Sequence, residues 1–324
     1  MTQPSSRKEF LKQSAQIGVG LLSGSALAVP SQKAAGSLAT PIPIVDTHQH
    51  LWDFRKFRPP WLQSEPKLNR STTMEDYYKA TKGLNVVKTV YMEVDVDPKQ
   101  QVAEAEWVTE VCKQHNTPMV AGVVSCRPNS PQFAEYVRRF KGNPYIKGVR
   151  QVLQVPEAPK GLCLQPTYVK HIRLLGELGL TFDICIRPTE LSDALKLVEL
   201  CPKTRFILDH CGNASARNPH QAQWERDMAR LGEKPNVVCK ISGIIKTVKQ
   251  GWNAGEELEN IILHTIDSFG IKRVMFGGDW PVCNMTSSFR GWVDTVKWVL
   301  RNHSPEEQKC LFHDNAVAFY GLSS

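Results

Sequence analysis

The sequence of 324 residues lacks any uninterrupted apolar run of about 18 residues, the length that a membrane-spanning helix needs. It also lacks basic runs interleaved with aromatic residues, so its net charge of +8 predicts no nucleic-acid partner. The scattered positive charges favour attraction of an anionic small molecule instead. With 41% hydrophobic and 22% charged residues, the composition predicts a soluble globular protein without stable membrane insertion.

The cysteines form no CxxC pair, and their number is odd. Several lie inside apolar runs, where cysteine behaves as a small hydrophobic residue. We therefore expect mostly free thiols rather than a disulfide framework.

The N-terminus differs in composition from the rest of the chain. Ser6-Arg-Lys-Glu-Phe-Leu-Lys12 precedes an apolar run rich in Gly, Ala and Ser, with a small-x-small site at Ala26-Leu-Ala28. This layout predicts a bacterial export signal over residues 1–28 and a linker over 29–41. It resembles a twin-arginine signal with lysine as the second basic residue, which implies a periplasmic or otherwise exported protein. The alternative is a disordered or weakly amphipathic arm on a cytoplasmic protein.

From residue 42 to residue 324 the pattern alternates between β-branched runs and helical periodicity, which predicts one domain. The strands are expected at 42–50, 86–95, 119–124, 145–152, 180–186, 205–210, 237–242 and 273–279. Eight strands alternating with helices predict a (β/α)₈ TIM barrel of the α/β class. An open doubly wound sheet is the alternative, but no GxGxxG turn follows the first strand.

Polar residues stand where the strands end. His48 and His50 are two apart at the end of the first strand, so their side chains share a face and can converge on one atom. Later strand ends carry further polar residues: Lys147, Arg150, Asp183, His210, Lys240, Ser242 and Asp279. Each residue alone is typical of a hydrogen-bonded buried group. Three histidines and two carboxylates together favour a cationic centre or an activated water, because unpaired buried polar groups are costly.

Strand parity narrows this set. Phe206, Leu208 and His210 alternate on one face, which predicts that Asp209 points towards the surrounding helices and is structural. Asp279 follows a Gly277-Gly278 pair, which leaves room beside it for a ligand or a close backbone approach.

With these residues in view, the chain resembles the amidohydrolase superfamily, in its TIM-barrel branch of sugar lactonases. The resemblance spans about residues 44–321 and rests on seven blocks: Asp46-Thr-His-Gln-His-Leu-Trp-Asp53, Lys147-Gly-Val-Arg150, Leu180-Thr-Phe-Asp183, Leu208-Asp-His-Cys-Gly212, Cys239-Lys-Ile-Ser-Gly243, Met275-Phe-Gly-Gly-Asp-Trp-Pro-Val282 and Asn315-Ala-Val-Ala-Phe-Tyr320. It implies hydrolysis of a lactone such as L-fuconolactone or L-rhamnonolactone, or of a related cyclic ester.

Three positions depart from the family pattern. Gly278 replaces a serine, Glu93 stands where a neutral residue is expected, and Asp183 occupies the strand that carries a histidine in two-metal members. The second departure implies an altered substrate choice. The third implies one divalent metal, or none.

The resemblance assigns roles to the strand-end residues. A water held between His48, His50 and Asp279, on Zn²⁺ or without metal, would lose its proton to Asp279 as it attacks the lactone carbonyl. His210 and Arg150 would stabilise the oxyanion or hold the substrate. The expected substrate-binding residues are Trp52, Asp183, Lys240 and Glu93, with Asp183 also a candidate metal ligand and an ion pair inside the barrel as the alternative role.

Two other functions stay open at this point. One is a decarboxylase of the same superfamily acting on a small carboxylated substrate, and the other is a non-catalytic protein that binds a small ligand. The retained histidines and Asp279 argue against the second. The sequence also leaves open whether the chain forms a homo-oligomer.

Overall fold

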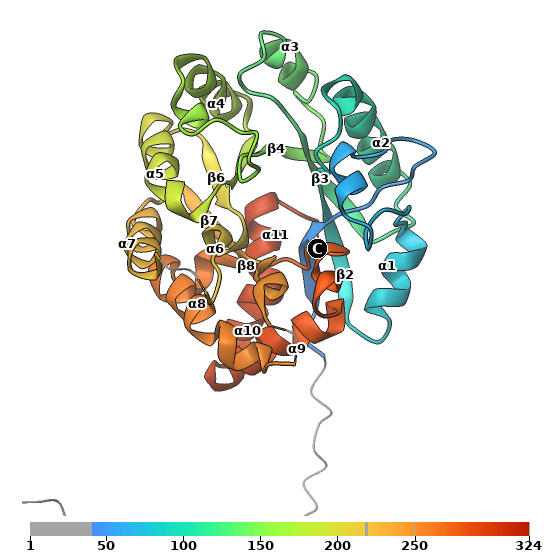
Figure 1. Cartoon of the computed structure of the whole chain (residues 1–324). Coiled ribbons are helices and arrows are strands. Elements are labelled where there is room, and N and C mark those ends of the chain that lie inside the picture. Colours follow the sequence, from blue (N-terminus) through green and yellow to red (C-terminus); the bar gives the residue numbers. More distant parts are fainter. Residues whose placement is uncertain (1–40, 218–219, 250, 324) are drawn as a thin grey trace, which may run out of the picture. The chain divides into compact units, whose positions relative to one another are not determined.

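The computed structural model describes residues 41–217, 220–249 and 251–323 (Figure 1). The predicted export signal, and the linker up to residue 40, lie outside the described residues. The strands are β1 Ile44–Gln49, β2 Val86–Met92, β3 Met119–Ser125, β4 Ile146–Val152, β5 Thr181–Cys185, β6 Arg205–Leu208, β7 Val237–Ile241 and β8 Val274–Phe276. The helices are α1 Met74–Thr81, α2 Gln101–Lys113, α3 Phe133–Arg138, α4 Pro166–Leu178, α5 Leu191–Leu200, α6 His210–Asn213, α7 Gln221–Gly232, α8 Ala254–Phe269, α9 Phe289–Val299, α10 Pro305–Lys309 and α11 Asn315–Tyr320.

The eight strands are parallel and paired in chain order, from β1 to β8. An isolated bridge between Gln49 and Trp280 brings the last strand back beside the first, and the amide of His50 donates to the Trp280 carbonyl at 2.9 Å. Helices surround the ring of strands (Figure 1). The predicted (β/α)₈ barrel is therefore confirmed.

Side chains of the strands divide between two apolar layers. Phe182, Phe206 and Leu208 belong to the large core between the strands and the outer helices. A second cluster lies inside the barrel and joins six strand residues to three from the C-terminus: Val45, Val90, Met92, Ala121, Val123, Met275, Ala316, Tyr320 and Leu322. The C-terminal segment thus closes one end of the barrel, and Figure 1 shows α11 near the middle of the ring.

Local sequence signals begin several of the outer helices. Ser288 accepts a hydrogen bond from the amide of Gly291 and caps α9. Ser304 and Glu307 form a capping box at α10, because each side chain accepts from the other residue's amide. Within the described residues, no helix is both long enough and apolar enough to cross a bilayer.

Candidate active site

His48 and His50 converge on one atom, as their spacing predicts, and that atom belongs to Asp279. The Nε2 atoms of His48 and His50 lie 3.8 Å and 3.2 Å from Asp279 Oδ1. His50 is held by its other ring nitrogen, which lies 3.0 Å from the carbonyl of Met92. Both histidines and Asp279 are buried. The two histidines therefore present one ring nitrogen each to the same carboxylate.

Asp279 lies beyond β8, in a left-handed backbone conformation with φ of 51°. The preceding glycines allow this approach, since a Cβ on Gly277 would lie 2.8 Å from the Cβ of His48. Asp46 joins the two segments because its Oδ1 accepts from the amides of His48 at 3.0 Å and Gly278 at 2.7 Å. Its role in positioning both sides of the site is a feature that the sequence analysis missed.

His210 lies at the start of four consecutive residues with positive φ, from 57° at His210 to 56° at Asn213. Left-handed backbone is unfavourable for residues other than glycine, so strain is stored in this turn. The turn brings the His210 ring to 4.5 Å from the ring of His48, between centroids. Ser242 Oγ holds its Nδ1 at 2.8 Å, which leaves Nε2 free of that contact.

The predicted direction of the Asp209 side chain is wrong. Phe206 and Leu208 face the helices, so the alternation directs Asp209 into the barrel rather than out of it. His210 also reaches the interior, because the strand ends at Leu208 and the backbone then turns left-handed. Asp209 is fully buried at the centre of the ion-pair network. One oxygen lies 3.0 Å from Arg150 Nη1 and the other 3.3 Å from Lys240 Nζ.

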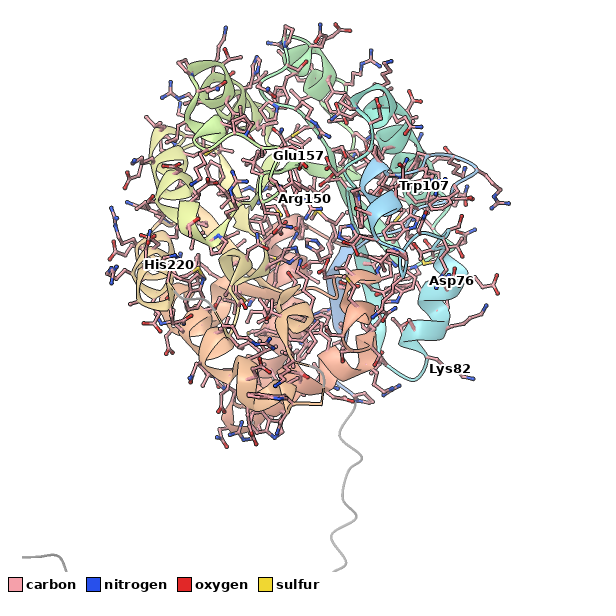
Figure 2. All side chains as sticks on the ribbon, viewed as in Figure 1. Asp76, Lys82, Trp107, Arg150, Glu157 and His220 are labelled. Carbon is pink, nitrogen blue, oxygen red and sulfur yellow. The ribbon has the colours of Figure 1, made fainter. Side chains whose placement is uncertain are left out.

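Arg150 joins this network to the histidines, and Figure 2 shows it near the middle of the ring. Its Nη1 lies 3.2 Å from His48 Nε2, and its Nε donates to Glu93 Oε1 at 2.7 Å. Glu93 also accepts from Ser125 Oγ at 2.6 Å. Glu93 is therefore the anchor of Arg150, which accounts for an acidic residue at this position.

Lys240 and Asp183 form a fully buried ion pair at 2.5 Å. Burial disfavours the charged lysine, but Asp183 and Asp209 outweigh it and raise the pKa of Lys240. This geometry agrees with the alternative role expected from the sequence, an ion pair inside the barrel rather than substrate binding. The structure does not bring Trp52 into the cluster, because its indole donates to the Arg70 carbonyl at 2.6 Å and packs edge-on against Trp61.

The protonation states suit a metal ion. Burial lowers the pKa of His210 to about 4 and that of His48 well below its ordinary value, so both rings are neutral at pH 7. Burial opposes the charge on Asp279, but the neighbouring His210 and His50 outweigh it and hold the pKa of Asp279 below its ordinary value. Neutral imidazole and ionised carboxylate are the forms that bind divalent cations.

The donor geometry suits one divalent ion. Ligand atoms of His48, His210 and Asp279 all lie within 4.8 Å of one another. Within the described residues, Asp279 Oδ2 is buried without a hydrogen-bond partner. His210 is therefore a candidate metal ligand that the sequence did not predict as one. Of the predicted ligands, His50 lies against Asp279 but outside this group, and Asp183 is paired with Lys240.

The charges lead to the same conclusion. Four buried carboxylates meet two buried cations in this network, namely Glu93, Asp183, Asp209, Asp279, Arg150 and Lys240. A divalent ion would cancel the excess of negative charge, whose burial is otherwise costly. Cys185, Asp209 and His210 form another group of potential ligands, but Arg150 and Lys240 already balance Asp209.

Comparisons with known proteins relate the whole barrel to one family. The model of the amidohydrolase family matches residues 45–322. An uncharacterized protein of Sinorhizobium fredii is 29% identical over 86% of this chain and 98% of its own length. The L-fucono-1,5-lactonase of Burkholderia multivorans is 24% identical over 86% of this chain and 96% of its own. A crystal structure of an amidohydrolase from Burkholderia multivorans with bound zinc has a TM-score of 0.76, at 22% identity, covering 87% of this chain and all of that one.

Proposed function

This chain belongs to the amidohydrolase family, and we propose that it opens the ring of a lactone by adding water to the ester carbonyl. The observation that carries the proposal is the ionised Asp279 beside the neutral rings of His48 and His210. Its second oxygen is buried and has no hydrogen-bond partner within the described residues. An ionised carboxylate in a site of this kind can accept a proton from a water molecule.

His48, His210 and Asp279 would hold the metal, for which we propose Zn²⁺. Nitrogen and oxygen donors suit this ion, and the relative of known structure binds it. When bound, the ion would supply Lewis acidity that polarises a carbonyl and lowers the pKa of water. Ser242 Oγ at 2.8 Å from His210 Nδ1 fixes the ring that must offer Nε2.

Asp279 and Arg150 have different roles in the proposed reaction. Asp279 removes a proton as the water oxygen bonds to the lactone carbonyl, and later gives that proton to the ring oxygen as the ester bond breaks. Arg150 Nη1, between His48 and Asp209, supplies positive potential where the carbonyl oxygen becomes negative. The product is a hydroxy acid, which ionises at pH 7 and releases one proton to the solvent.

Sugar lactones are the substrate class that we propose, and L-fuconolactone and L-rhamnonolactone are the first compounds to test. The support is the similarity to an enzyme named L-fucono-1,5-lactonase. A panel of sugar lactones, read by acid release with a pH indicator, tests the proposal. We expect turnover of at least one member above the rate without enzyme. Release of CO₂ from small carboxylated substrates, with no lactone turnover, would instead support a decarboxylase.

Metal content supplies a separate test of the cofactor. We expect about one zinc per chain by elemental analysis, loss of lactone hydrolysis after chelation, and recovery with added Zn²⁺. Full activity in protein shown to contain no divalent metal would remove the histidines as ligands. It would leave Asp279 as the proposed base.

We also propose that residues 1–28 direct export through the twin-arginine route. Replacement of both Arg7 and Lys8 by glutamine should then retain the full-length chain in the cytoplasm, which fractionation of expressing cells would show. Unchanged export of this variant would contradict the twin-arginine assignment.

A further inference from the structure

Lys246 lies on a short 3₁₀ turn, η5 (Ile244–Thr247), that follows β7. This turn is fitted against the site on two sides. A Cβ on Gly243 would lie 2.3 Å from Nδ1 of His210, so the turn packs directly on that ring. The carbonyl of Ile245 accepts from Thr286 Oγ1 at 2.9 Å, which ties the turn to the loop that follows Asp279.

The turn also lies at the end of the barrel that holds the site. β7 pairs with both β6 and β8, and His210 follows β6 whereas Asp279 follows β8. Lys246 therefore stands on an element that adjoins both groups, at the end of the barrel where the chemistry is proposed.

Lys246 is half-buried, and the described part of the chain gives its side chain no hydrogen bond or ion pair. The carboxylates nearest the site are already assigned, since Arg150, Lys240 and the proposed divalent ion balance them. A half-buried cation beside a balanced cluster gains most from a counter-charge that the ligand brings.

We infer that Lys246 binds a carboxylate carried by the substrate, and that the preferred lactone is an acidic one. The inference rests on the proposed function, because it names the substrate class of the same site. A lysine ammonium offers three donors to a carboxylate. The excess positive charge of the whole chain would add long-range attraction for such an anion.

The test compares two lactones that share a ring. D-glucaro-1,4-lactone ends in a carboxylate, and D-glucono-1,4-lactone ends in a neutral hydroxymethyl group. For Lys246→Gln, the ratio of kcat/KM for the acidic lactone to that for the neutral one should fall about tenfold or more, because a hydrogen bond between charged groups is lost. The loss should lie mainly in KM for the acidic compound.

Lys249→Gln is the matched control. It removes the same charge from the same loop, but Lys249 is exposed and lies over the ring of Trp252 at 5.0 Å. This variant should keep the wild-type ratio. An equal loss on both lactones in Lys246→Gln, or a ratio that does not change, would overturn the inference. Thermal unfolding of each variant would show whether the fold is retained.

A binding measurement separates this inference from the reaction. D-glucarate, the open-chain dianion, is titrated into the zinc-loaded protein by calorimetry. If no lactone of the panel is hydrolysed but Lys246→Gln weakens glucarate binding and Lys249→Gln does not, the anion site stands and the proposed reaction fails. Glucarate binding that is the same in wild type and Lys246→Gln would overturn the anion site.

Discussion

The two ends of the barrel interior are built from the same eight strands but hold opposite chemistry. One end is filled by apolar side chains such as Val90 and Val123, and is closed by residues of the C-terminus. The other holds the ion pairs of Arg150 and Lys240 with the histidines and Asp279. The apolar end has no charge to desolvate, whereas every charge at the other end must be matched.

The difference separates stability from chemistry. Closure by α11 and Leu322 buries apolar area, which is favourable without any specific partner. At the charged end each buried ion costs several kcal/mol of hydration, which its partners must offset. We therefore expect substitutions at the apolar end to change stability alone, and substitutions at the charged end to change activity, or stability through unpaired charge.

The largest effect is expected for Asp279→Asn. The amide retains the shape but cannot accept the proton, so kcat should fall about 10³- to 10⁴-fold. Assay of the most active lactone gives the rate, and circular dichroism checks that the fold is retained. Near wild-type turnover would remove Asp279 from its role as base.

Asp209→Asn should have the next largest effect. It removes the carboxylate that lies between Arg150 and Lys240, leaving two buried cations with less negative charge. Breaking a buried ion pair on one side costs about 3 to 5 kcal/mol, which urea unfolding would measure. A stability equal to that of the wild type would show that these cations are balanced elsewhere.

The pH dependence of stability gives a test at Glu104, a residue beside the charged end of the barrel. Burial, together with the charge of Glu93, raises the pKa of Glu104 to about 7 from an ordinary 4.5, so the folded chain holds this proton more tightly than the unfolded chain does. This group stabilises the fold most below pH 4.5, and that contribution is lost as the pH rises towards 7. The change is about 3 kcal/mol.

Glu104→Gln should lack that component. The free energy of unfolding, measured by urea titration at pH 5 and at pH 8, should therefore differ less in the variant than in the wild type. Identical pH dependence in the two proteins would show that Glu104 is already ionised at pH 5.

The smallest effect is expected at the apolar end. Val90→Ala removes two buried carbons and should lower the free energy of unfolding by about 2 kcal/mol. Lactone hydrolysis below the unfolding temperature should keep the wild-type kcat, because Val90 lies in the sealed cluster. A tenfold loss of kcat would contradict the conclusion that the apolar end affects stability alone.

Prediction from sequence succeeded where local periodicity decides the outcome. Eight strands, their order and the convergence of His48 and His50 on one atom follow from patterns of a few residues. It failed at Asp209 because strand parity was assigned without knowing which face Phe206 and Leu208 would cover. The left-handed turn at His210 also ended the alternation, and no motif before it announces that turn.

By itself, the sequence determined the barrel, the end of it where the polar residues gather, and the residue types available there. It did so because β-strand alternation and helix periodicity are local properties of the chain. Only the tertiary structure decided which charged groups pair: Glu93 anchors Arg150, Asp183 pairs with Lys240, and Lys246 makes no salt bridge within the described residues. Pairing depends on distances across the barrel, between residues far apart in the chain, and such distances exist only once the ring of strands has closed.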